Sequence, residues 1–172
     1  AFCFDNSGRF KNFTCFGKEN TKELAGSIRD AVLKFHEQKP QAKRIIIHFY
    51  KVMSKRELKP ILDTIYNGLD LPIPIIVVTI NKTVSKELLA FDTADYNNLM
   101  PYSGTYIKMA ERQYLLFNNT RYNPASKVAD KEYHFPVKIK LTSTHLELLE
   151  DESLVDILID QVYQFSRMYW KS

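Results

Sequence analysis

Three short groups of polar residues in this chain have the side chains that bind phosphate or nucleic acid. Lys51 follows an apolar segment that ends in His-Phe-Tyr, and residues 81–83 (Asn-Lys-Thr) follow a second apolar segment. Residues 118–122 (Asn-Asn-Thr-Arg-Tyr) combine amides, a guanidinium and an aromatic ring. Lys, Arg, Asn and Thr contact phosphate oxygens, and aromatic rings stack on unpaired bases. The predicted nucleic-acid-binding residues are Lys51, Lys82, Asn119 and Arg121.

Two of these groups also have an ordinary structural interpretation. Residues 81–83 fit a solvated loop equally well, and residues 118–122 fit a plain hairpin turn. The basic residues Lys55, Arg56 and Lys59 are typical of a solvated helix face. Spacing alone does not separate these alternatives.

A two-metal nuclease site needs several carboxylates at one edge of a sheet, because two divalent cations must be neutralised and positioned there. The acids nearest the predicted strand ends are Asp5, Glu19, Asp70 and Asp92. Asp5 suits a turn, and Glu19 suits the acidic start of a helix. Lys51 would repel a divalent ion at the most favourable position. The sequence therefore predicts that this segment carries no metal site.

Other catalytic arrangements have little support. No two of the four histidines have the spacing of a zinc site. His48, close to a strand end, is better interpreted as a satisfied structural histidine than as a catalytic one. The sequence contains neither a serine nucleophile elbow nor a glycine-rich phosphate loop, and the cysteines have no basic neighbour in sequence.

Hydrophobic periodicity predicts the elements that position these residues. Residues 135–144 alternate as a half-solvated strand, and the last helix has an apolar stripe that includes Leu154, Ile157, Leu158, Val162 and Phe165. Ser54 and Glu57 have the spacing of a capping box. Helices are expected at residues 21–38, 54–68 and 150–170, and strands at residues 2–4, 9–16, 44–49, 73–80, 104–109, 112–117 and 135–144.

The order of these elements predicts the fold class. Three consecutive isoleucines in residues 44–49 suggest a central parallel strand that is buried on both faces. Hairpin, helix, parallel strand, helix and parallel strand is the order of a ribonuclease-H-like α/β core, a mixed sheet flanked by helices. The opening hairpin would then belong to the antiparallel half of that sheet.

Size and composition indicate one folded domain. The chain has 172 residues, of which 45% are hydrophobic and 13% aromatic, values unlike those of a disordered segment. Its net charge of +4 is compatible with phosphate partners but is weak support for them. No apolar run reaches the roughly 18 residues that span a membrane. Because the sequence opens in a strand without an initiator Met, we expect one domain cut from a longer protein.

The two cysteines favour a reducing compartment. A hairpin that places Cys3 opposite Phe10 would leave Cys15 about five residues away, or roughly 17 Å along the strand. Bridged Cα atoms lie within about 7 Å of each other, so no disulfide is expected. Together with the absence of a signal-peptide pattern, this predicts a cytoplasmic location.

Several ordered motifs resemble the PIWI domain of prokaryotic Argonautes. Residues 44–48 (Arg-Ile-Ile-Ile-His) resemble the strand that carries a catalytic Asp in that family, and residues 76–82 resemble the next strand with its lysine. Residues 101–105 and 114–122 resemble the following hairpin. Residues 135–139 and 161–172 resemble the last strand and the helix before the C-terminus. The resemblance covers nearly all 172 residues.

The departures from the family pattern imply an inactive member. Tyr50 stands where active members have Asp, and Lys51 stands where Gly is usual. The first catalytic strand would precede Ala1 and the last catalytic position would follow Ser172. Loss of the Asp should abolish cleavage, as in the short prokaryotic class and some inactive long members.

What the resemblance implies is a non-enzymatic role in prokaryotic defence. Such proteins bind a guide RNA or DNA and a single-stranded complementary target, then signal to an effector, in the short class through an APAZ-type partner. No cofactor is implied in this segment, and Mg²⁺ would take part in binding the guide 5′-phosphate in the full protein. The resemblance implies no membrane partner.

Two other functions are compatible with the sequence. One is an active Mg²⁺-dependent ribonuclease-H-like endonuclease whose acids lie outside this segment, with Glu19 as one of them. The other is a protein-interaction scaffold. Cleavage by the full-length protein would favour the first, and absence of salt-sensitive nucleic-acid binding would favour the second.

Overall fold

The structure is a computed structural model that describes most of the chain. The described residues are 2–4, 10–13, 21–38, 43–50, 52, 54–69, 73–81, 89–94, 99–118 and 135–167. They divide into two compact units. Unit 1 comprises residues 1–45 and 53–74, and unit 2 comprises residues 46–52 and 75–172.

Unit 1 contains a hairpin and two helices. Strands β1 (Phe2–Phe4) and β2 (Phe10–Phe13) pair antiparallel, and helices α1 (Thr21–Gln38) and α2 (Lys55–Leu69) pack against each other. The bounds of α1 agree with the prediction. The amide of Leu58 donates to the carbonyl of Ser54 over 2.9 Å, so α2 begins where the sequence indicated. Pro60 is accommodated inside α2 although it has no amide hydrogen to donate.

The predicted register of the hairpin was wrong. Cys3 lies opposite Asn12 instead of Phe10, and the pairing shifts by one residue between Cys3 and Phe4. A β-bulge of this kind adds a residue to one strand, and the sequence pattern does not mark it. Cys15 lies outside the described residues, so the prediction of no disulfide stays a prediction.

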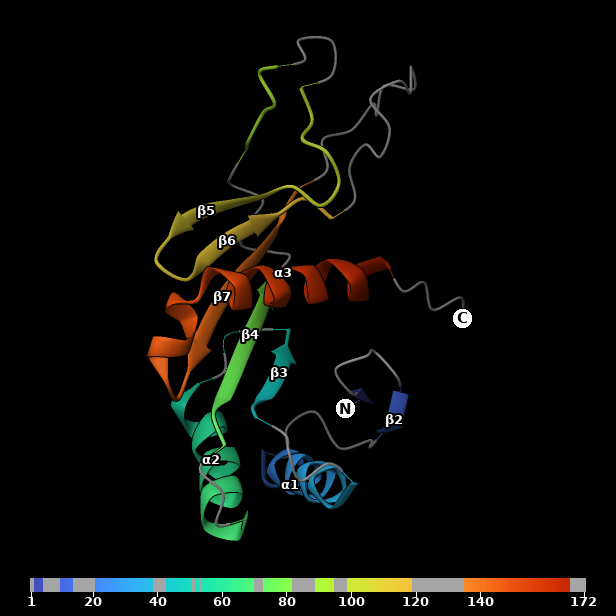
Figure 1. The fold of residues 1–172 in the computed structure, drawn as a ribbon, viewed down its shortest axis with the longest axis vertical. Coiled ribbons are helices and arrows are strands. Elements are labelled where there is room, and N and C mark those ends of the chain that lie inside the picture. Colours follow the sequence, from blue (N-terminus) through green and yellow to red (C-terminus); the bar gives the residue numbers. More distant parts are fainter. Residues whose placement is uncertain are drawn as a thin grey trace. The chain divides into compact units, whose positions relative to one another are not determined.

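Unit 2 is a mixed α/β structure built on a five-stranded sheet in the order β3-β4-β7-β6-β5. The amide of Ile45 donates to the carbonyl of Pro74 over 2.9 Å, so β3 and β4 begin side by side and run parallel. Antiparallel pairing joins β4 to β7, β7 to β6 and β6 to β5. Figure 1 shows these strand directions. The five strands are β3 (Ile45–Phe49), β4 (Ile75–Asn81), β5 (Tyr106–Ala110), β6 (Gln113–Leu116) and β7 (Val137–Ser143).

Two expectations about this sheet were wrong. The antiparallel half is formed by β5, β6 and β7, whereas β1 and β2 form a two-stranded sheet of their own. Among the described strands of the sheet, β3 lies at an edge and is only half-buried, so its three isoleucines do not mark a central strand there. β4 has that role: residues 75–79 are all buried, as expected for a strand covered on both faces.

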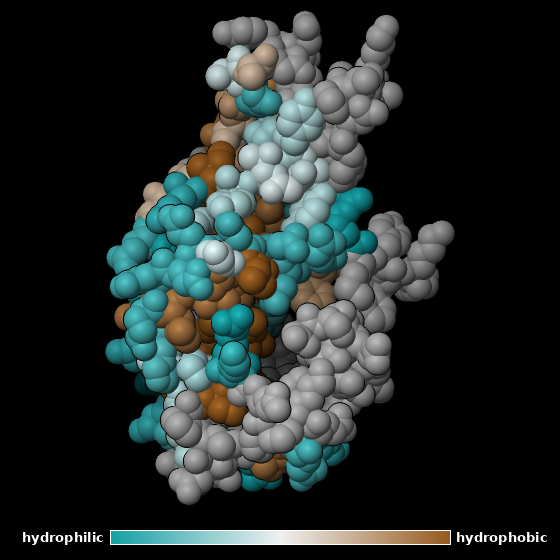
Figure 2. All heavy atoms as spheres, viewed as in Figure 1, coloured by the Kyte–Doolittle hydropathy of each residue, from teal (hydrophilic) through white to brown (hydrophobic). Residues whose placement is uncertain are grey.

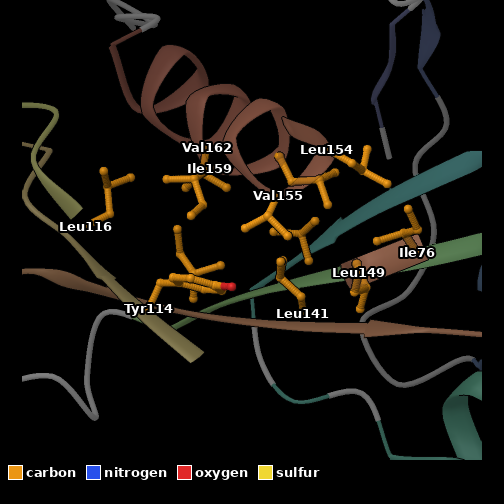
Figure 3. Packing of buried hydrophobic residues seen from close by; sticks show 12 residues of the cluster. Ile76, Tyr114, Leu116, Leu141, Leu149, Leu154, Val155, Ile159 and Val162 are labelled. Carbon is orange, nitrogen blue, oxygen red and sulfur yellow. The ribbon is translucent and has the colours of Figure 1, made fainter. Parts of the chain in front are cut away.

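Helix α3 (Glu152–Arg167) closes the core of unit 2 over one face of the sheet. The predicted alternation in β7 is confirmed, because Val137, Ile139 and Leu141 are buried between more exposed neighbours. Figure 3 shows the apolar side chains of α3 meeting those of the strands. Figure 2 shows mostly hydrophilic residues on the surface where α3 crosses the view. The buried residues of α3 are Leu154, Val155, Leu158, Ile159 and Val162.

The last helix also differs in detail from the prediction. A separate 3₁₀ helix, η2 (Leu146–Glu150), precedes α3, and Asp151 lies between them. The Asp151 carboxylate accepts the amide of Ser153 over 3.0 Å and caps α3. Ile157, assigned to the apolar stripe from sequence, is 49% exposed. Among the described helices, none has the length and apolar character required to cross a membrane.

Two neighbouring residues of α3 provide a test of this core. Leu158 is fully buried, whereas Ile157 is half exposed. We expect Leu158→Ala to lower the free energy of unfolding by about 2–5 kcal/mol, because it leaves a cavity among packed side chains. Ile157→Ala should cost less than about 1 kcal/mol. Urea unfolding measures both, and equal losses would contradict the orientation of α3.

Candidate nucleic-acid interface

The strand directions bring three strand ends to one edge of the sheet, which we call the carboxyl edge. β3, β4 and β6 point the same way, because β7 is antiparallel to both β4 and β6. Their last residues are followed by Tyr50, by Lys82 and by Phe117 with Asn118. β7 starts at the same edge, after Phe135 and Pro136. In parallel α/β sheets, ligands bind outside the carboxyl ends of the strands.

All four predicted contact residues directly follow this edge in the sequence. Lys51 comes after Tyr50, Lys82 after Asn81, and Asn119 and Arg121 after Asn118. The four residues themselves lie outside the described residues. Their contact with nucleic acid therefore stays a prediction, although the described strands that lead to them end together.

Tyr50 is exposed and directly follows the end of β3. Its side chain is 60% exposed, and its ring is tilted by 43° against that of Phe49, with the centroids 5.0 Å apart. Val52, two residues on, is equally exposed. An exposed aromatic ring and an exposed apolar side chain thus lie just after the end of β3.

His48 is enclosed between β3 and α3. Its Nε2 lies 3.2 Å from Oε1 of Gln161, and its ring meets the edge of Phe165 at a centroid distance of 5.3 Å. Its Nδ1 is buried and has no hydrogen-bond partner among the described residues. The sequence predicted a structural histidine whose ring nitrogens are both hydrogen-bonded. This prediction is confirmed for Nε2 and is wrong for Nδ1. Burial lowers the pKa of the imidazole below its ordinary value of 6.5, and the bond with Gln161 opposes this shift.

The last turns of α3 reach the carboxyl edge through these contacts. Gln161 and Phe165 both contact His48, the fourth residue of β3. Arg167, in the last turn of α3, is exposed and lies two residues after Phe165. Phe135, before β7, is 43% exposed. Neither Arg167 nor Phe135 was predicted from the sequence as a binding residue. Nothing in the local sequence pattern marks either of them.

A tight turn fixes the entry of β5 at the same edge. Gly104 has a φ of +94°, and its amide donates to the carbonyl of Phe117 over 2.7 Å. A Cβ at this position would lie 3.6 Å from the ring of Tyr163, whose hydroxyl is 3.2 Å from Oγ of Ser103. The positive φ requires glycine here, and the turn ties β6 to α3.

The acids considered from sequence do not assemble a metal site in the described part of the chain. Asp92 accepts the amide of Ala94 over 3.0 Å, a turn interaction. Asp5, Glu19 and Asp70 lie outside the described residues. Within the described ranges, no group of three or more His, Cys, Asp or Glu side chains is placed to hold a metal ion.

Comparison with known proteins adds no family assignment. No family model matches the chain, and no curated protein matches it significantly.

The change of folding stability with pH tests whether His48 is buried as the structure shows. The folded state has the lower pKa, so the unfolded state binds more protons as the pH falls below about 6.5. Stability is therefore greatest above that pH and decreases on acidification, by up to about 1 kcal/mol per pH unit. His48→Gln should flatten this slope in urea unfolding between about pH 7.5 and pH 5.

His145→Gln is the matched control, because it removes an imidazole at the far end of β7 and leaves His48 in place. The slope should persist in that variant. An unchanged slope in His48→Gln would show that another group causes it.

Proposed function

We propose that the chain is a catalytically inactive PIWI-like module that binds a guide strand and a complementary target. The observation that carries this proposal is the exposed Tyr50 at the carboxyl edge, at the position where the family resemblance calls for a catalytic Asp. The ribonuclease-H-like fold is part of the proposal, and the mixed sheet with parallel β3 and β4 is compatible with it.

The chemistry of the carboxyl edge favours binding over cleavage. Tyr50 offers a single phenol oxygen where an Asp would offer the two oxygens of a carboxylate, so it does not take the part of a bridging metal ligand. Exposed aromatic rings at Tyr50 and Phe135 suit stacking on unpaired bases, and Arg167 supplies positive charge. Lys51 and Lys82 would add phosphate contacts that do not depend on sequence.

Sequence selectivity would then come from pairing between guide and target, as in other guided systems. The module would pass the binding event to an effector in the cytoplasm, through an APAZ-type partner if the protein is of the short class.

A guide-loading assay tests the whole proposal. The full-length protein with its native partner is incubated with a labelled guide, a complementary single strand and Mg²⁺, and both binding and cleavage are followed on gels. We expect guide-dependent target binding with an intact target. A cut target would instead establish an active endonuclease, and a lack of salt-sensitive binding would favour a protein scaffold.

The salt dependence of binding tests the predicted phosphate contacts. Lys82→Ala should weaken binding evenly across sequences and lower the slope of log K against log salt by about one. Lys34→Ala, which removes an exposed lysine from α1, is the control of equal charge and should leave the slope unchanged. Equal slopes for Lys82→Ala and the original protein would remove Lys82 from the interface.

A pair of substitutions separates the ring of Tyr50 from its hydroxyl. Tyr50→Ala should weaken single-strand binding by about 1 kcal/mol or more, because one stacking platform is lost. Tyr50→Phe should bind like the original protein, since the ring remains. Fluorescence anisotropy with a labelled single strand measures both, and equal effects of the two changes would argue against stacking.

A further inference from the structure

A cleft of about 590 Å³ lies between the β5–β6 hairpin and the start of α3. It lies entirely within unit 2. One wall comes from the hairpin and the other from η2 and the first turns of α3. In Figure 1 the hairpin turn and the start of α3 are on the same side of the sheet. The volume is in the range of sites that take up a ligand or the side chains of a peptide.

The two walls carry unequal charge. The hairpin contributes Lys108 and Arg112, and Arg112 is held in an ion pair with Glu111 at 2.6 Å. The opposite wall contributes Glu150, Glu152 and Asp156. Neither Glu150 nor Glu152 forms an ion pair with a described residue. The lining therefore holds two cations and four carboxylates, a local excess of negative charge in a chain whose net charge is +4.

Two tyrosines of the hairpin, Tyr106 and Tyr114, also line the cleft, and Tyr106 is hydrogen-bonded to one of the carboxylates. The hydroxyl of Tyr106 donates to Oδ1 of Asp156 over 2.5 Å, and the rings of Tyr106 and Tyr114 meet edge to face with centroids 6.0 Å apart. The bond to Asp156 raises the pKa of Tyr106, and burial followed by the charges of Asp156 and Glu152 raises the pKa of Tyr114. The carboxylates of α3 therefore act electrostatically on the tyrosines of the hairpin, on the opposite side of the cleft.

Apolar residues complete the lining. Leu149 and Val155 are buried at the cleft, whereas Leu146 is 50% exposed. A ligand with a cationic head and an aliphatic stem matches all three kinds of surface. The head would meet carboxylates and the face of an aromatic ring, and the stem would cover leucine and valine.

We infer that this cleft is a docking site for a basic segment of a partner protein, which inserts an Arg or Lys side chain between Glu152 and Tyr106. The charge complementarity is local, because the chain as a whole repels a cationic peptide. The site differs from the carboxyl edge: the β5–β6 turn is at the opposite end of the sheet, since β6 runs from that turn toward the carboxyl edge. The inference goes beyond nucleic-acid binding and does not depend on it.

Peptide binding to the whole chain tests the inference. The probe is a fluorescein-labelled octa-arginine peptide, compared by anisotropy with an octa-glutamate peptide at about 50 mM and 300 mM salt. We expect the cationic peptide alone to bind, with an affinity that falls as salt screens the carboxylates. Glu152→Gln together with Asp156→Asn should weaken binding about tenfold.

Glu37→Gln together with Asp63→Asn is the control, because it removes the same two charges from exposed positions on α1 and α2. It should change the affinity less than about twofold. Because Asp156 holds Tyr106, Glu152→Lys is a second variant that leaves that hydrogen bond intact, and it should weaken binding at least as much as the double change. No binding of octa-arginine, or equal losses in the cleft and control variants, would overturn the proposal. Nucleic-acid binding by the same variants is expected to be unchanged.

Discussion

The pairing of β7 with β4 is the constraint on which the rest of unit 2 depends. Six residue pairs align from Ile76 with Ser143 to Asn81 with Lys138. This alignment places Val78 beside Leu141 and Ile80 beside Ile139, on the face that α3 covers. A slip of one residue would turn every one of these side chains to the opposite face, so burial of the apolar set fixes the register.

The same pairing creates the carboxyl edge. Because β7 runs antiparallel to β4 on one side and to β6 on the other, β4 and β6 must end together. β3 joins them by running parallel to β4. Polar groups at residues 50–51, 81–82 and 118–121, far apart in sequence, therefore follow strands that finish at one place. The grouping of these residues at one edge therefore follows from the directions of the strands and does not depend on side-chain contacts.

The sequence predicts elements well where their pattern is local and poorly where it depends on pairing partners. The bounds of α1 and the alternation of Val137, Ile139 and Leu141 follow from periodicity. The edge position of β3 does not, because Ile45, Ile46 and Ile47 look the same in an edge strand and in a central one. The enclosure of His48 by Gln161 joins residues 113 positions apart, which no local pattern indicates. The cleft beside Tyr106 was missed for the same reason.

Helix α3 serves both ends of unit 2. Its first turns supply Glu152 and Asp156 to the acidic cleft, and its last turns supply Gln161 and Phe165 to the enclosure of His48. Between them, Leu154, Leu158 and Val162 are almost fully buried, so the helix is held along its length. A packed core resists small displacements. A ligand that moved one end of α3 would therefore have to move the helix as a body, and the proposed protein-docking and nucleic-acid sites share one rigid element.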